Sequence, residues 1–264
     1  MITLANFQQQ LHEYLEKFEF MAEKYDQTAR HSLELELLID DYSRFITNVD
    51  NEEAWRQLER QNPWQLDAVA AELRAKSALC VAIMEKYRAL KLLHGEREIA
   101  HYFRNIEACI EKEFGSFHIT SDAKVLLVGS GSFPMTPLLI AKRTGAEVIG
   151  IDIDEEAISL GLRVVEKLGA GLNIRLEQTS AEDLDVLKDI THIIFSSTVA
   201  AKYDILDQLY ILTSDQVVVA MRYGNQLKSL FNYPMKECDR RKWKLVDHIL
   251  RPDDVFDIAL YTKA

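Results

Sequence analysis

The sequence is poor in cysteine, proline and glycine: 264 residues contain three cysteines, five prolines and ten glycines. Cys80, Cys109 and Cys238 are an odd number at wide spacing without a CxxC pair, which argues against a disulfide framework or a thiolate metal site. The seven histidines form no HxH or HExxH pattern. The sequence therefore predicts reduced, buried thiols and no metal site.

Long apolar runs are also missing. None approaches the ~20 residues needed to cross a bilayer, and the N-terminal stretch lacks the basic and apolar regions of a secretory signal peptide. The formal net charge of −11 does not favour binding to phosphate backbones. We therefore expect a cytoplasmic protein that binds neither membranes nor nucleic acids.

Residues 1–118 are predicted to form an all-α helical bundle domain. The first glycine is Gly95, and Pro63 is the only proline before Pro134. Apolar residues recur at the three- and four-residue spacing of amphipathic helices. The pattern breaks near residues 26–32, 48–53, 62–64 and 94–96. These breaks predict about five helices, the last ending with a glycine cap at Gly115.

The pattern changes from residue 124 onward, where short apolar segments alternate with helical ones, as in a parallel doubly wound sheet. The predicted strands are 124–128, 147–151, 173–178, 191–196, 216–222, 243–250 and 255–262. The predicted helices are 134–143, 155–168, 201–212 and 225–231. Only residues 251–254 separate the last two strands, so these must pair antiparallel. A Rossmann-like parallel sheet with an antiparallel terminal hairpin indicates a class I methyltransferase-like α/β domain spanning 119–264.

The stretch 124–154 carries the strongest functional signal: strand, glycine turn (Gly129-Ser130-Gly131), helix, strand and acid. Glycine permits positive φ and close approach of a ligand, and the following helix start offers free N–H groups. An acid at the end of the second strand suits a ribose diol. Asp152 is preferred for this role, because the competing Asp154 can instead cap the next helix.

The glycine turn favours S-adenosylmethionine (SAM) over NAD. NAD-binding turns need a third small residue at GxGxxG, and that position is Pro134 here. A ligand without a pyrophosphate fits better; a structural turn without ligand is the alternative. The turn after the third strand is where this fold holds adenine; a surface loop is the alternative. The predicted SAM contacts are Gly129, Ser130, Gly131, Phe133, Pro134, Asp152, Ile153, Ser180, Ala181, Glu182 and Ser196.

Polar residues at later strand ends are predicted to bind the second substrate. The hydroxyls of residues 196–198 follow the fourth strand at the carboxyl edge, where open α/β sheets bind ligands; helix capping is the competing interpretation. Arg222 ends the next strand, and its guanidinium can bind a carboxylate in a bidentate manner, through two hydrogen bonds. A surface arginine is the alternative. The predicted substrate contacts are Ser197, Thr198, Arg222, Tyr223 and Tyr233.

Further segments point to a family. They are GSGSFPMT (129–136), MRYG (221–224), FNYP (231–234), THIIFSST (191–198), FDIALY (256–261) and YFRNIE (102–107). They resemble the nicotianamine synthase-like family, most closely its bacterial, staphylopine-type opine-metallophore branch. The resemblance covers nearly the whole chain, most specifically from Gly95 onward.

The resemblance implies a helical domain covering a SAM-binding domain. It also implies transfer of the 3-amino-3-carboxypropyl (2-aminobutanoate) group of SAM to the α-amine of histidine, D-histidine in the staphylopine-type branch, with release of methylthioadenosine. A partner opine dehydrogenase would then use the product to complete a metallophore. We also expect a homodimer.

The family uses a glutamate and a tyrosine from its helical region, and the matching positions here are Glu85 and Tyr102. An amine nucleophile is mostly protonated at neutral pH, so a base within hydrogen-bond reach is required. If the tyrosine matches Phe103 instead, that hydroxyl is missing. The alternatives are a solvated helix face for Glu85 and a core-edge aromatic for Tyr102. Two other functions stay open, a SAM-dependent small-molecule N-methyltransferase and a non-catalytic SAM-binding protein.

Overall fold

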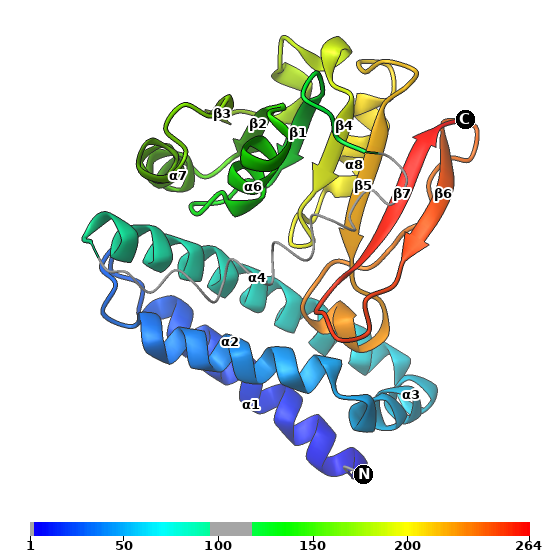
Figure 1. Cartoon of the computed structure of the whole chain (residues 1–264). Helices are drawn as coiled ribbons and strands as arrows, with labels where there is room; N and C mark the ends of the chain where they lie inside the picture. Colours follow the sequence, from blue (N-terminus) through cyan, green and yellow to red (C-terminus); the bar gives the residue numbers. More distant parts are fainter. Residues whose placement is uncertain (1–2, 96–117) are drawn as a thin grey trace. The chain divides into compact units, whose positions relative to one another are not determined.

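The computed structural model describes residues 3–95 and 118–264, which fall into two compact units that interleave along the chain (Figure 1). The helical unit comprises Met1–Tyr87, Tyr223–Met235 and Arg251–Asp257, and the sheet unit comprises Arg88–Arg222, Lys236–Leu250 and Ile258–Ala264. The predicted domain boundary at 118/119 lies at the edge of the undescribed stretch 96–117 and stays a prediction.

The helical unit is built from amphipathic helices. They are α1 (Leu4–Glu23), α2 (Ser32–Thr47), the 3₁₀ helix η1 (Val49–Asn51), α3 (Glu52–Gln61) and α4 (Pro63–Leu93), whose residues 88–93 belong to the sheet unit. Their apolar faces form one core around fully buried Phe7, Phe18, Tyr42 and Leu73. The helix breaks predicted from the sequence are confirmed up to Leu93. The predicted fifth helix and its cap at Gly115 lie outside the described residues.

The sheet unit contains a sheet in the order β3-β2-β1-β4-β5-β7-β6. The strands are β1 (Lys124–Val128), β2 (Glu147–Asp152), β3 (Ile174–Gln178), β4 (His192–Phe195), β5 (Val218–Tyr223), β6 (Trp243–Ile249) and β7 (Asp257–Lys263). The pairs β1–β2, β2–β3, β1–β4 and β4–β5 are parallel, whereas β6–β7 is antiparallel. This is the class I methyltransferase-like α/β fold expected from the sequence.

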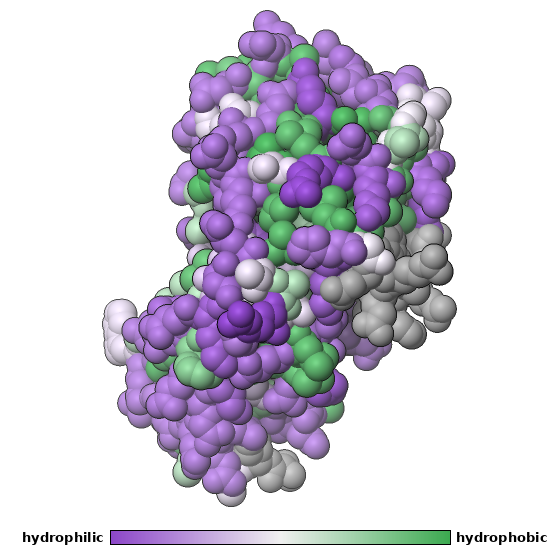
Figure 2. Space-filling model, turned by 90° about the vertical axis from the view of Figure 1, so that its left-hand side faces the viewer, coloured by the Kyte–Doolittle hydropathy of each residue, from purple (hydrophilic) through white to green (hydrophobic). Residues whose placement is uncertain are grey.

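Three α-helices follow strands of this sheet: α6 (Met135–Thr144), α7 (Glu155–Leu168) and α8 (Lys202–Leu209). Both α6 and α7 pack against β2 and β3. The face shown in Figure 2 is mostly hydrophilic, with an apolar area within the sheet unit; on α7, Leu162 and Leu168 are exposed. None of the helices in the described ranges is both long and apolar enough to cross a membrane.

One predicted helix, 225–231, differs from the structure. Its residues form the 3₁₀ helix η4 (Gln226–Leu230), which belongs to the helical unit. Gln226 has φ of 51°, a left-handed conformation that does not start an α-helix. The predicted helix 201–212 is also shorter, since α8 ends at Leu209.

Buried polar contacts hold η4 within the helical unit. The Tyr42 hydroxyl donates to the Leu230 carbonyl at 2.9 Å, and Arg74 Nε donates to the Ser229 carbonyl at 2.7 Å. Phe231 lies edge-on to the Tyr42 ring, with 5.5 Å between the centroids. Side chains of α2 and α4 therefore fix a segment more than a hundred residues away in sequence.

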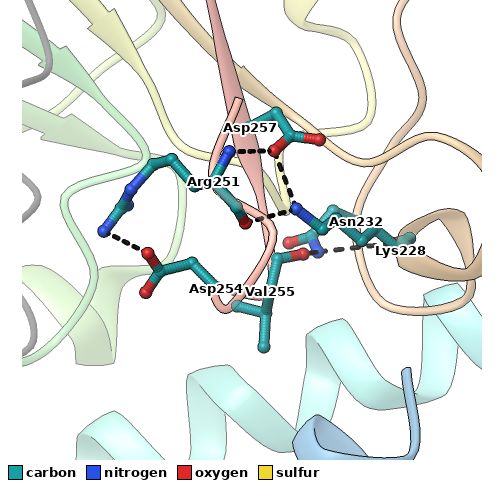
Figure 3. A network of polar contacts seen from close by, with 6 residues as sticks. All are labelled: Lys228, Asn232, Arg251, Asp254, Val255 and Asp257. Carbon is teal, nitrogen blue, oxygen red and sulfur yellow. Dashed lines mark hydrogen bonds and ion pairs between the residues drawn. The ribbon is translucent and has the colours of Figure 1, made fainter. Parts of the chain in front are cut away.

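A second network joins η4 to the segment before β7 (Figure 3). Lys228 Nζ donates to Asp257 Oδ1 and to the Arg251 carbonyl, both at 2.7 Å, and the Arg251 N–H donates to Asp257 Oδ1 at 2.8 Å. Asn232 Nδ2 donates to the Val255 carbonyl at 2.6 Å. The Lys228 and Asp257 side chains are 13% and 12% exposed, so this ion pair is shielded from water.

The shielded Lys228–Asp257 pair predicts a measurable loss of stability. Asp257→Asn should lower the free energy of unfolding by about 3 kcal/mol, because it leaves a buried ammonium without its carboxylate. Lys228→Met should cost a similar amount, and the double variant less than the sum of the two. Urea denaturation measures all three.

Arg240→Gln is the control, because the Arg240–Glu237 pair spans 3.8 Å with side chains 89% and 92% exposed. Its effect should stay within about 0.5 kcal/mol. Equal losses for Asp257→Asn and Arg240→Gln would contradict the assignment.

Candidate functional site

The predicted glycine turn joins β1 to α6. Gly129 has φ of 82° and Gly131 of 67°, both left-handed. The N–H groups of Gly129 and Ser130 bond to the Ile151 carbonyl at 2.9 and 3.0 Å. A Cβ at Gly129 would lie 2.6 Å from Val199 Cγ2. Glycine is therefore required there both by its backbone conformation and by close packing against the segment after β4.

Asp152, at the end of β2, ties this turn to the second strand. Its Oδ2 accepts from the Gly131 N–H at 3.0 Å, and its Oδ1 accepts from the Asp154 N–H at 3.1 Å. A carboxylate has about four lone-pair directions, so Asp152 keeps capacity to accept from a ribose. Asp154 instead caps α7 by accepting from the N–H groups of Glu156 and Ala157, as the competing sequence interpretation stated.

The other predicted contacts around the turn differ in exposure. Ile153 is 83% exposed, whereas Phe133 is buried in an apolar cluster of the sheet unit. The buried hydroxyls of Ser130 and Ser132 have no hydrogen-bond partner within the described residues. Pro134 occupies the cap position of α6. Among the described residues, the turn therefore holds two buried hydroxyls that are available to a ligand.

The segment after β3 forms a 3₁₀ turn rather than an open loop. Ser180 Oγ donates to Asp183 Oδ2 at 2.6 Å, and Ala181 is buried. Glu182 is exposed and lines a pocket of about 240 Å³ with residues 184–189 and Leu212. None of the other predicted SAM contacts lines that pocket, so it is separate from the glycine turn.

After β4, Ser196 Oγ lies 3.2 Å from Thr198 Oγ1, and Ser197 is buried. Helix capping does not explain these hydroxyls, because the cap residue of α8 is Ala201 and no side chain caps that helix. They lie at the carboxyl edge of the sheet together with Gly129, since a Cβ on Gly129 would be 3.1 Å from Ser196 Cβ.

The sequence analysis missed Lys202, the first residue of α8. Its side chain is fully buried, and its Nζ donates to the carbonyls of Arg222 at 2.6 Å and Ser197 at 3.3 Å. Lys202 therefore ties the ends of β4 and β5. A cation at a helix N-terminus opposes the helix dipole, and this unfavourable placement is the signal that the sequence offered. Arg222 itself donates from Nη2 to Thr136 Oγ1 of α6 at 3.2 Å.

The remaining predicted residues belong to the helical unit. Glu85 is half-buried on α4. Tyr223 is buried, and burial, with a smaller contribution from the charge of Asp257, raises its pKa to about 12. The Tyr233 ring centroid lies 5.4 Å from Arg74 Cζ, and Arg74 is a second residue that the sequence analysis missed. Tyr102, with the competing Phe103, lies outside the described residues.

Burial raises the pKa of the Cys80 thiol to about 12, so Cys80 is not a nucleophile at neutral pH. Cys109 lies outside the described residues. In the part of the chain that the structure describes, no group of three or more His, Cys, Asp or Glu side chains is arranged to hold a metal. The expectation of a metal-free enzyme stays a prediction.

The chain is similar to several known proteins. Residues 119–258 match the family model described as a methyltransferase domain. An L-histidine 2-aminobutanoyltransferase of Pseudomonas aeruginosa (strain UCBPP-PA14) is 28% identical over 200 residues, 75% of each chain. An enzyme of the same name from Yersinia pestis is 35% identical over 168 residues, 62% of this chain and 61% of the relative.

Two solved structures of a nicotianamine synthase (MtNAS) share the fold over almost the entire chain. The complex with MTA and tNA has a TM-score of 0.78 and 15% identity, covering 98% of both chains. A Glu-to-Gln variant in complex with S-adenosylmethionine has a TM-score of 0.73 and 13% identity, covering 95% of this chain and 98% of that chain. The likeness extends beyond the α/β part to the helical residues.

The two glycines Gly129 and Gly171 provide a matched test of the turn. Both have left-handed φ, 82° and 83°, but a Cβ at Gly171 meets nothing within 4 Å. Gly171→Ala should therefore cost about 1 kcal/mol of strain and leave SAM affinity unchanged. Gly129→Ala should weaken SAM binding by at least about tenfold, because the turn must shift away from Val199.

Calorimetric titration with SAM and thermal unfolding of both variants make the comparison. Unchanged SAM affinity in a folded Gly129→Ala variant would show that the ligand does not lie over this turn.

Proposed function

We propose that the chain, which belongs to the methyltransferase-domain family, uses SAM to transfer the 2-aminobutanoate group to the α-amine of histidine. It is a SAM-dependent transferase, and the resemblance to the nicotianamine synthase-like family is confirmed. The observation that carries the proposal is the pairing of two likenesses. Curated relatives over three quarters of the chain are 2-aminobutanoyltransferases, and a nicotianamine synthase shares the fold over 98% of it.

The proposed reaction is a nucleophilic substitution at a carbon that is bonded to the sulfonium sulfur of SAM. The sulfonium of SAM makes three carbons electrophilic, and the carbon held in line with the nucleophile reacts. Here the histidine nitrogen bonds to the terminal carbon of the aminobutanoate chain, and that carbon's bond to sulfur breaks. The bonding electrons stay on sulfur, so neutral methylthioadenosine leaves, and the amine proton passes to a base.

We assign the binding of SAM to the predicted carboxyl-edge residues. The glycine turn, with the hydroxyl of Ser130, contacts the amino-acid portion. Asp152 accepts from the ribose, and the segment 180–182 contacts adenine. The proposed acceptor contacts are the residues predicted from the sequence: Ser197, Thr198, Arg222, Tyr223 and Tyr233. Glu85 is the proposed base, with Tyr102 as its proposed partner.

The family resemblance and the names of the relatives point to different enantiomers of histidine. The resemblance to the staphylopine-type branch implies D-histidine, whereas the curated relatives are named for L-histidine. We favour L-histidine, because those names are the support that bears directly on the acceptor; the expectation of D-histidine stays untested. The product would be substrate for an opine dehydrogenase. A homodimer and a cytoplasmic location stay predictions.

An N-methyltransferase is the second candidate, since the matching family model is a methyltransferase domain. The co-product separates the two functions. Incubated with SAM and L- or D-histidine offered separately, the purified protein should form methylthioadenosine together with histidine carrying one aminobutanoate group, detected by mass spectrometry. S-adenosylhomocysteine and a methylated histidine would instead establish the methyltransferase.

Replacement of the proposed base should slow turnover without weakening SAM binding. Glu85→Gln keeps the size of the side chain but removes its basicity, so we expect kcat to fall by about 10²–10⁴. Glu72→Gln is the control, because Glu72 is exposed on the same helix. Equal kcat values for both variants, with SAM and histidine saturating, would remove Glu85 from the mechanism.

A further inference from the structure

Arg74 of α4 carries more hydrogen-bond donors than the described protein uses. A guanidinium has five N–H donors in a planar fork. In Arg74, Nε donates to the Ser229 carbonyl at 2.7 Å. The four N–H groups on Nη1 and Nη2 have no acceptor among residues 3–95 and 118–264, and no carboxylate there forms an ion pair with them.

This guanidinium is half-buried and is fixed in place from one side. Burial lowers the pKa of Arg74, but an arginine stays charged at neutral pH. The Tyr233 ring lies against it, with 5.4 Å between the ring centroid and Cζ. Asp67 is close enough for its charge to act on Arg74 but forms no ion pair with it. A charge that is partly removed from water without a directly bonded counter-ion is costly, and an anionic ligand would lower that cost.

We propose that Arg74 and Tyr233 form a carboxylate-binding site in the helical unit, and that its occupant is the carboxylate of the acceptor amino acid. Because Nε is already bonded to Ser229, the Nη1 and Nη2 groups present the fork that matches the two oxygens of a carboxylate. The Tyr233 ring lies next to the fork and can pack against the rest of the amino acid. The identity of the acceptor rests on the proposed function; the carboxylate chemistry does not.

If Arg74 served only to hold η4, the five donors of an arginine would not be required. A single donor to the Ser229 carbonyl holds η4, and Lys in place of Arg can supply one. The site also has a geometric consequence. Arg74 and Glu85 are eleven residues apart on α4, about 16 Å along the helix axis. Since one carbon separates the amine and carboxylate of an amino acid, and Arg74 is held at the Ser229 carbonyl, Glu85 can contact the amine of the same acceptor only by extending toward Arg74.

Binding can be tested independently of turnover by arginine Nε NMR of the wild-type protein. The Arg74 signal is identified by its absence from Arg74→Lys. Acetate should shift this signal in a saturable manner, whereas acetamide, which has the same shape without the charge, should not. No shift with acetate, or equal shifts with both, would overturn the site. A shift with SAM alone but not with L- or D-histidine would overturn the acceptor as occupant.

Kinetics provide the second measurement. Arg74→Gln should raise KM for histidine about ten- to hundredfold, the usual effect of losing hydrogen bonds to a charged group, while KM for SAM stays within about twofold. Wild type should prefer histidine to histidinamide, and Arg74→Gln should lose that preference; Arg74→Lys should retain part of it. Lys76 lies on the same helix as Arg74, and Lys76→Gln, which removes an exposed ion pair with Glu19 of α1, should behave as wild type.

Failure of the proposed function can be distinguished from failure of the carboxylate site. A wild-type protein that forms no aminobutanoyl product from either enantiomer refutes the proposed function, and the acetate titration then still decides the carboxylate site. A wild-type protein that turns over histidine, together with an Arg74→Gln variant that keeps the histidine-to-histidinamide preference, refutes the site alone.

Discussion

The hydrogen bond from the Gly131 N–H to the Asp152 carboxylate is the interaction on which the site in the sheet unit depends. It joins the ends of β1 and β2 at 3.0 Å, while the second carboxylate oxygen accepts from Asp154 and so sets the entry into α7. The glycine turn is confined on its other side by Val199. One carboxylate thus fixes the turn and the adjacent helix start, which are the parts that a nucleoside ligand would meet.

The helical unit follows a different rule, because short segments from late in the sequence are built into its early helices. Buried hydroxyl and guanidinium groups of Tyr42 and Arg74 bond to carbonyls of η4, and the Lys228–Asp257 pair secures the segment before β7. These contacts satisfy main-chain groups that would otherwise be buried without partners. Residues predicted to contact substrate, Tyr223 and Tyr233, are therefore positioned by the helical unit.

Local signals explain which parts were predictable. Helix α7 was predicted at its observed bounds because Asp154 caps it and Gly169 follows its last residue. The strands were predictable from apolar runs between such signals. The structure of η4 was not, since the positive φ of Gln226 leaves no trace in its residue type. Lys202 and Arg74 were missed for a related reason, because each acts on a carbonyl 20 or 155 residues away.

The two arginines differ in what their guanidinium groups already bind. In the sheet unit, Arg222 donates from Nη2 to Thr136 Oγ1, and the Lys202 ammonium bonds to its carbonyl. In the helical unit, Arg74 donates from Nε to the Ser229 carbonyl, which leaves the Nη1 and Nη2 groups without an acceptor among residues 3–95 and 118–264. Binding a carboxylate through two parallel hydrogen bonds requires two such N–H groups on one guanidinium. The proposed carboxylate site therefore rests on Arg74, which reasoning from the sequence did not single out.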